Sequence, residues 1–128
     1  MADVRAHMAR DLLTVGPELT LVDVARRMVE RNVGAVLVLE DGELAGIMTE
    51  RDLMRAVARG LRDDATVGES MTRHPETIAP DDSLGHAATL MIHGGFRHLP
   101  VVEGGEVVGI VSIRDLVHVL EDSAPRGA

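Results

Sequence analysis

Two segments of the sequence carry a hydroxyl side chain three residues before an aspartate: Thr49 with Asp52, and Ser112 with Asp115. This spacing supports two interpretations. In a capping box, the hydroxyl and the carboxylate satisfy free backbone N–H groups at the start of a helix, without a ligand. Alternatively, the helix start attracts an anion while the carboxylate accepts hydrogen bonds from two vicinal hydroxyls, which are the demands of a ribose with a phosphate. The capping box is the simpler interpretation, and both remain open.

Composition excludes several other kinds of chemistry. The chain has no cysteine, and its 13 basic residues are all arginine. Disulfides, thiolate sites, lysine general bases and Walker-type phosphate loops are therefore excluded. The net charge of −8 and the single aromatic residue, Phe96, argue against a nucleic-acid partner. We expect no membrane span, because no apolar run approaches about 20 residues, and we expect a cytoplasmic protein because the start of the chain lacks a signal-like stretch.

Metal binding and catalysis are not predicted either. Asp82 and His86 are four residues apart at a predicted helix start, but position 86 matches Asp23 in the internal repeat described below, so we expect it to face solvent. Ser112, His98 and Asp115 contain the residue types of a hydrolytic triad, yet no G-x-S-x-G turn surrounds the serine. We therefore expect neither a metal site nor an enzyme.

The sequence is internally duplicated. A shift of 63 positions aligns residues 4–53 with 67–116 without a gap, and 17 of these 50 pairs are identical, where about three would be expected by chance. We divide the chain into a first repeat (1–60), a linker (61–66), a second repeat (67–120) and a flexible tail (121–128). A unit of about 60 residues is marginally stable alone, so we expect both repeats to share one core.

Each repeat is predicted to form helix, strand, helix, strand, strand and helix. Apolar residues at helical spacing mark the first long helix of each copy. The first begins at Thr20 and stops at Asn32 with Gly34, and the second begins at Asp82 or Ser83 and stops at the Gly94-Gly95 pair. Apolar β-branched runs around an Asp-Gly or Gly-Gly pair predict a hairpin in each copy. A second helix follows each hairpin, with Leu53, Met54 and Val57 on one face of the first. The apolar helix stripes are Leu21, Val24, Ala25, Met28 and Val29, and Leu84, Ala87, Ala88, Met91 and Ile92. The fold class is α/β, with two pseudo-symmetric repeats packed into one module.

The segments GIMTERD (46–52) and GIVSIRD (109–115), placed within this duplication, closely resemble the tandem cystathionine-beta-synthase-type (CBS) pair, or Bateman module. The resemblance covers residues 4–120 and includes RHLPVV (97–102) and HPETI (74–78). It implies that clefts between the two CBS repeats bind AMP, ADP or ATP, with S-adenosylmethionine a weaker candidate and no required cofactor. It assigns ribose binding to Asp52 and Asp115, with Thr49 and Ser112 facing the ribose or phosphate.

The two repeats differ at one position of this pattern. The second has Arg97 and His98 where the first has Gly34 and Ala35. The resemblance assigns Arg97 and His98 to the phosphate, whereas an ion pair between Arg97 and a nearby carboxylate is the alternative. We therefore expect one strong ligand site instead of two equal ones. The candidate ligand-binding set is Thr14, Ala35, Thr49, Asp52, Thr77, Arg97, His98, Ser112 and Asp115.

Two functional hypotheses follow. In the first, the chain is a non-catalytic regulatory module that senses an adenosine-containing small molecule. In the second, it is a dimerising protein-interaction module with vestigial clefts. The resemblance implies a homodimer in both cases. Because we find no catalytic, transport or DNA-binding domain in the sequence, we expect regulation of an unidentified protein in trans.

Overall fold

The computed structural model describes residues 3–123, which form two compact units. One unit spans Asp11–Pro75. The other combines the segments Met1–Arg10 and Glu76–Ala128, of which residues 3–10 and 76–123 are described. Most of the predicted flexible tail, from residue 124 on, lies outside the described residues. No helix in the described part of the chain has the length and apolar character needed to cross a membrane.

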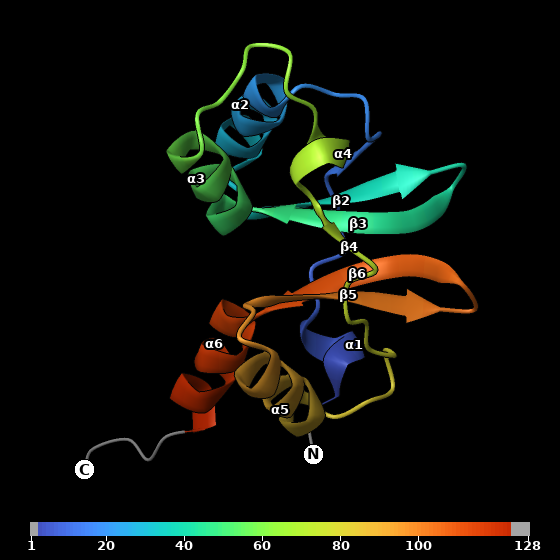
Figure 1. Ribbon diagram of the computed structural model, residues 1–128. Coiled ribbons are helices and arrows are strands. Elements are labelled where there is room, and N and C mark those ends of the chain that lie inside the picture. Colours follow the sequence, from blue (N-terminus) through green and yellow to red (C-terminus); the bar gives the residue numbers. More distant parts are fainter. Residues whose placement is uncertain (1–2, 124–128) are drawn as a thin grey trace. The chain divides into compact units, whose positions relative to one another are not determined.

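The unit 11–75 contains a four-stranded sheet with helices on one side of it (Figure 1). The strand order is β1-β2-β3-β4, in which β1 pairs parallel with β2 and the other pairs are antiparallel. The elements in chain order are β1 (Thr14–Val15), α2 (Leu21–Arg31), β2 (Ala35–Glu40), β3 (Glu43–Thr49), α3 (Glu50–Ala58), α4 (Val67–Ser70) and β4 (Thr72–Arg73). The short strand β4 was not predicted, because its residues, Thr72 and Arg73, are both exposed and show no apolar pattern.

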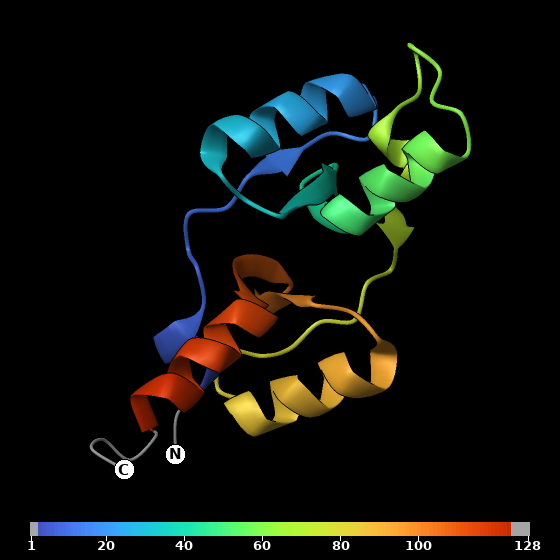
Figure 2. The same ribbon diagram turned by 90° about the vertical axis from the view of Figure 1, so that its left-hand side faces the viewer.

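The second unit has a matching architecture, and its helices also lie on one side of its hairpin (Figures 1 and 2). Its elements are α1 (Val4–His7), α5 (Leu84–Gly94), β5 (His98–Glu103), β6 (Glu106–Ser112) and α6 (Ile113–Ser123). Single bridges replace the short strands: Ile78 pairs parallel with Val101, and Ala9 pairs antiparallel with Ile110. The first strand predicted for the second repeat is thus reduced to one bridge at Ile78. Together, the two units confirm the predicted α/β repeat.

The predicted helix and turn signals are confirmed in both units. The side chains of Thr20 and Ser83 cap α2 and α5 by accepting hydrogen bonds from the backbone N–H groups three residues on. Both helices end at a residue in the left-handed region, Asn32 with φ 53° and Gly95 with φ 72°. The hairpin turns have two consecutive positive φ angles, which Asp-Gly and Gly-Gly pairs accommodate at low cost. The turn residues are Asp41, Gly42, Gly104 and Gly105.

Most of the buried side chains form two clusters, one in each compact unit, instead of the single shared core that we expected. Each unit has its own cluster, and each cluster uses the short first helix of the other sequence repeat. Val4 of α1 and the C-cap residue Met8 pack with the core residues of the second unit, whereas Val67 and Met71 pack in the unit 11–75. The core of each unit is thus built from residues of both sequence repeats.

Part of the predicted apolar helix faces lies outside these cores. Val29 is 80% exposed and its repeat counterpart Ile92 is 73% exposed. Met54 and Val57 of α3 are also exposed, at 67% and 62%. The spacing of the apolar residues therefore predicted the helices correctly but overestimated how many of their side chains are buried. The face of each helix that contacts the core is narrower than its apolar face.

Two strand glycines allow the segment after each short helix to lie against the sheet. A Cβ on Gly46 would lie 2.7 Å from both Met71 Sδ and the Thr72 carbonyl oxygen. A Cβ on Gly109 would lie 2.5 Å from Met8 Sδ and 3.0 Å from the Ala9 carbonyl oxygen. Because real Cβ contacts are longer than this, a side chain at either position would displace that segment.

Candidate functional site

The junction of β3 and α3 contains a complete capping box. The Thr49 backbone N–H and hydroxyl both donate to Oδ2 of Asp52, at 3.0 and 3.1 Å, and the Asp52 N–H donates to the Thr49 hydroxyl at 3.3 Å. Asp52 is only 8% exposed. The capping interpretation is thus confirmed at this junction. The cap uses only one oxygen of the Asp52 carboxylate, Oδ2.

The junction of β6 and α6 repeats this geometry with shorter bonds. The Ser112 backbone N–H and hydroxyl donate to Oδ2 of Asp115 at 2.7 and 3.0 Å, and the Asp115 N–H donates to the Ser112 hydroxyl at 3.3 Å. Asp115 is half-buried. Among the described residues, no donor lies within hydrogen-bond distance of its other oxygen, Oδ1. That oxygen can therefore accept hydrogen bonds from a ligand without disturbing the cap.

The second carboxylate oxygen distinguishes the two junctions. In the unit 11–75, Oδ1 of Asp52 lies 3.5 Å from the Thr72 hydroxyl and 4.0 Å from Nη1 of Arg55. The duplication places Ala9 at the position of Thr72, so the other junction lacks the equivalent hydroxyl. Sequence reasoning missed Thr72, because it reaches Asp52 only through the pairing of β4 with β3. Arg55 could have been found from its i, i+3 spacing to Asp52.

Arg97 and His98 lie next to the Ser112 junction within the same unit. His98 is the cross-strand partner of Ser112, and the Ile113 N–H donates to the Arg97 carbonyl at 2.9 Å. The Arg97 side chain is exposed, and in the described part of the chain no carboxylate pairs with it. The alternative of an Arg97 ion pair is therefore not found among the described residues.

The remaining candidates lie on neighbouring strands of their own units. Ala35 is the cross-strand partner of Thr49, and Thr14 pairs with Leu37, two residues along β2. Thr77 precedes Ile78, whose N–H donates to the Pro100 carbonyl at 3.1 Å. Backbone register thus brings each unit's candidates to one end of its strands: Thr14, Ala35, Thr49 and Asp52 in one, and Thr77, Arg97, His98, Ser112 and Asp115 in the other.

The weak metal candidates have local structural roles. Asp82 accepts a hydrogen bond from the Ala79 N–H at 3.1 Å, and the exposed His86 donates its backbone N–H to Ser83 at 3.0 Å. No group of three or more His, Asp or Glu side chains with metal-binding geometry occurs among residues 3–123.

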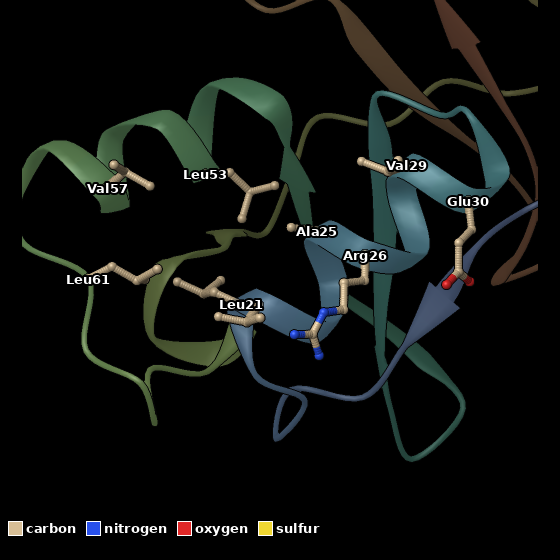
Figure 3. Close-up of a pocket in the computed structure, with 9 residues that line it drawn as sticks. Leu21, Ala25, Arg26, Val29, Glu30, Leu53, Val57 and Leu61 are labelled. Carbon is tan, nitrogen blue, oxygen red and sulfur yellow. The ribbon is translucent and has the colours of Figure 1, made fainter.

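An apolar groove lies between α2 and α3, separate from the capping junctions (Figure 3). Its volume is about 480 Å³, and Val22, Ala25, Val29, Leu53, Val57 and Leu61 contribute to its walls. Figure 3 shows Arg26 and Glu30 beside these apolar side chains. Exposed apolar surface of this kind is typical of a protein interface.

The comparisons with known proteins match nearly the whole chain. The family model described as the CBS domain matches twice, at residues 2–59 and 66–122. The CBS domain-containing protein YhcV of Bacillus subtilis is 37% identical over 117 residues, covering 91% of this chain and 84% of that protein. CBSCBSPB2 of Arabidopsis thaliana is 39% identical over 123 residues and 91% of this chain, which spans only 23% of the plant protein's length.

Two similar solved structures contain adenosine compounds. The CBS domain pair of MJ0100, in complex with methylthioadenosine and S-adenosyl-L-methionine, has a TM-score of 0.89 and 25% identity, covering 97% of this chain and 99% of that one. The CBS domain protein PAE2072 of Pyrobaculum aerophilum, complexed with AMP, has a TM-score of 0.84 and 28% identity, covering 94% and 97%. The double family match, the YhcV similarity and the duplicated capping junctions together establish that this chain belongs to the CBS domain family.

Proposed function

We propose that this chain is a non-catalytic regulatory module that binds an adenosine-containing ligand: AMP, ADP or ATP. The observation that carries this proposal is the Asp115 carboxylate, which caps α6 through one oxygen and leaves the other without a donor among the described residues. The AMP and S-adenosylmethionine complexes of similar proteins support the ligand class. We place the protein in the cytoplasm, in accord with its acidic, cysteine-free composition.

The proposed contacts use groups that the fold already holds in place. The 2′ and 3′ hydroxyls of the ribose donate to Oδ1 of Asp115, and the phosphate accepts hydrogen bonds from the side chains of Arg97 and His98. Each charge-assisted hydrogen bond contributes about 1.5 to 3 kcal/mol, so a few of them are enough for micromolar binding by a preformed site. Asp52 and Thr49 form the corresponding site of the first repeat.

We further propose that the Asp115 site binds more tightly than the Asp52 site. The second oxygen of Asp52 faces Thr72 and Arg55, and Ala35 supplies no polar group where the other repeat has His98. A ribose would have to compete with Thr72 and Arg55 for that oxygen. One strong site per chain is the expected stoichiometry.

Thermal unfolding with a ligand panel tests the proposal. The chain has no Trp or Tyr, so unfolding is followed by circular dichroism instead of intrinsic fluorescence. A ligand at 100 times its dissociation constant stabilises the fold by about 2.7 kcal/mol, or roughly 10 °C in Tm. We expect such a shift with at least one of AMP, ADP and ATP. If none of these, nor S-adenosylmethionine, shifts the Tm, the sensor function is refuted.

A dimerising interaction module is the second candidate function. The observation that favours it is the repetition of exposed apolar residues at matching positions: Val29 with Ile92, and Met54 with Val117. The groove of Figure 3 includes one of them, Val29, in its wall. A monomer gains nothing from exposed apolar residues repeated in both units, whereas a dimer buries them. An unidentified protein regulated in trans is part of both candidates.

Sedimentation analysis tests this second function. The wild type is expected to sediment as a dimer, and Val29→Glu is expected to shift it toward the monomer, because a charge would be buried in the interface. Arg27→Glu on the same helix is the control for added negative charge. A monomeric wild type, or an equal effect of the two substitutions, would contradict the dimer.

A further inference from the structure

A second cavity in the unit 11–75 is lined by residues of α3 and of the loop that leads from α3 to α4. Figure 1 shows this helix and this loop. Its volume is about 480 Å³, within the usual size of small-molecule sites. Asp52, Arg55, Arg59, Arg62 and Glu69 line it, together with apolar side chains. The cavity therefore combines three guanidinium groups with two carboxylates, in a chain whose net charge is −8.

The arginines follow one side of the helix. Arg51, Arg55 and the C-cap residue Arg59 are spaced four residues apart, and like charges at this spacing repel by a few tenths of a kcal/mol. An exposed helix usually alternates acids and bases at i, i+4 instead. Arg55 and Arg59 lie at the C-terminal end of the helix, where basic side chains interact favourably with the helix dipole, and both also line the cavity.

The three arginines that line the cavity differ in how far neighbouring carboxylates neutralise their charge. Arg62 donates to Asp64 at 3.1 Å and to Glu69 at 2.8 Å, and these interactions, led by the Asp64 hydrogen bond, raise the pKa of Arg62. Arg55 lies 4.0 Å from Asp52, the limit of an ion pair. Among the side chains that the structure describes, no carboxylate pairs with Arg59. Arg55 and Arg59 are thus the two cations available to an incoming anion.

This feature is specific to the first repeat. The ungapped repeat alignment, continued along the helix, places His118 opposite Arg55 and Asp122 opposite Arg59. The second repeat therefore cannot form the same cluster.

We propose that the cavity beside α3 binds a phosphate-bearing anion through Arg55 and Arg59. Guanidinium groups bind phosphate oxygens through paired, charge-assisted hydrogen bonds, and two of them suit a diphosphate better than a single phosphate. Asp52 also lines this cavity, and its carboxylate repels an anion that binds close to it. The phosphates therefore bind toward Arg59.

Two sources offer this chemistry. One is a free phosphate compound. The other is the diphosphate of a nucleotide whose ribose is held by Asp52, and this source rests on the function proposed above. In that case the first repeat would select ADP or ATP over AMP.

Calorimetric titration of the full chain distinguishes these sources, with inorganic pyrophosphate, AMP and ADP as probes. We compare the wild type with Arg59→Gln, and with Arg27→Gln as a control that removes one exposed charge from α2 of the same unit. Arg59→Gln is expected to weaken the anion's binding about tenfold, the loss of one charge-assisted interaction, while Arg27→Gln leaves it unchanged. Binding should also weaken with added salt. Circular dichroism verifies that both variants fold, and Arg55→Gln provides an independent second variant.

Each outcome bears on the proposal. Arg59-dependent binding of pyrophosphate supports it with a free anion as the source. Arg59-dependent binding of ADP, tighter than that of AMP and without pyrophosphate binding, supports it with a nucleotide as the source. If no probe depends on Arg59 or Arg55, or if Arg27→Gln weakens binding equally, the proposal is overturned. If AMP binds and its affinity does not depend on Arg59 or Arg55, the proposed adenosine sensor still stands. If pyrophosphate binds but no adenosine ligand does, only the sensor function is refuted.

Discussion

Replacing Asp115 by Glu separates helix capping from ligand binding. Glu at the third helical position serves a capping box as well as Asp does, so the Ser112 N–H and hydroxyl retain an acceptor. Asp115 is half-buried, which leaves room for the longer side chain, whereas the equivalent change at Asp52 would add a methylene at an 8% exposed position. We expect the unfolding free energy of Asp115→Glu to stay within about 0.5 kcal/mol of the wild type.

Ligand affinity should respond differently. The added methylene displaces the carboxylate by about 1.5 Å, the length of one C–C bond, and a ribose hydroxyl then loses its acceptor. The loss of one charge-assisted bond lowers the AMP affinity tenfold or more, at about 1.4 kcal/mol per factor of ten. Calorimetry measures this affinity, and chemical denaturation followed by circular dichroism measures stability. Asp115→Ala, which destroys the cap and costs about 1 kcal/mol, is the comparison. An Asp115→Glu variant that binds AMP as the wild type does would refute the ribose assignment.

Three further predictions concern single positions. Arg97→Gln should weaken AMP binding about tenfold but leave adenosine binding unchanged, because it removes only a phosphate contact; an equal loss for both ligands in calorimetry would contradict that role. Gly46→Ala should destabilise the chain by about 1 to 3 kcal/mol in denaturant melts, because its Cβ would lie 2.7 Å from the Thr72 carbonyl; unchanged stability would refute the close approach. Gly85→Ala in α5, where the nearest atom is 3.7 Å away, should instead stabilise it by about 0.5 to 1 kcal/mol, and a loss of stability there would show that the helix start is strained.

Local features were predictable because their signals are contained in a few neighbouring residues. The Asp41-Gly42 turn, the Thr20 cap and the Asn32 helix end each depend on the conformational preference of one or two residues, and the structure confirms them. The capping box of Thr49 and Asp52 belongs to the same class. Its ligand role was one of two open interpretations of the spacing until the family resemblance favoured it, since a cap explains the same residues without a ligand.

Features that depend on distant contacts were not predictable in the same way. Val4 and Val67 are identical in sequence and equivalent in the repeat, so nothing in the pattern indicates that each packs in the other repeat's unit. Val29 looks like a core residue because helical periodicity cannot distinguish an apolar face turned to the core from one left exposed. Thr72 reaches Asp52 across a strand pairing between residues far apart in the chain.

A crystal structure of the chain with AMP is the decisive test of the ribose assignment. Both ribose hydroxyls are expected within about 3 Å of Asp115 Oδ1, while Oδ2 keeps its bonds to Ser112 and the phosphate contacts Arg97. An AMP molecule bound with its ribose hydroxyls facing solvent, and with Asp115 contacting only its own helix start, would contradict it.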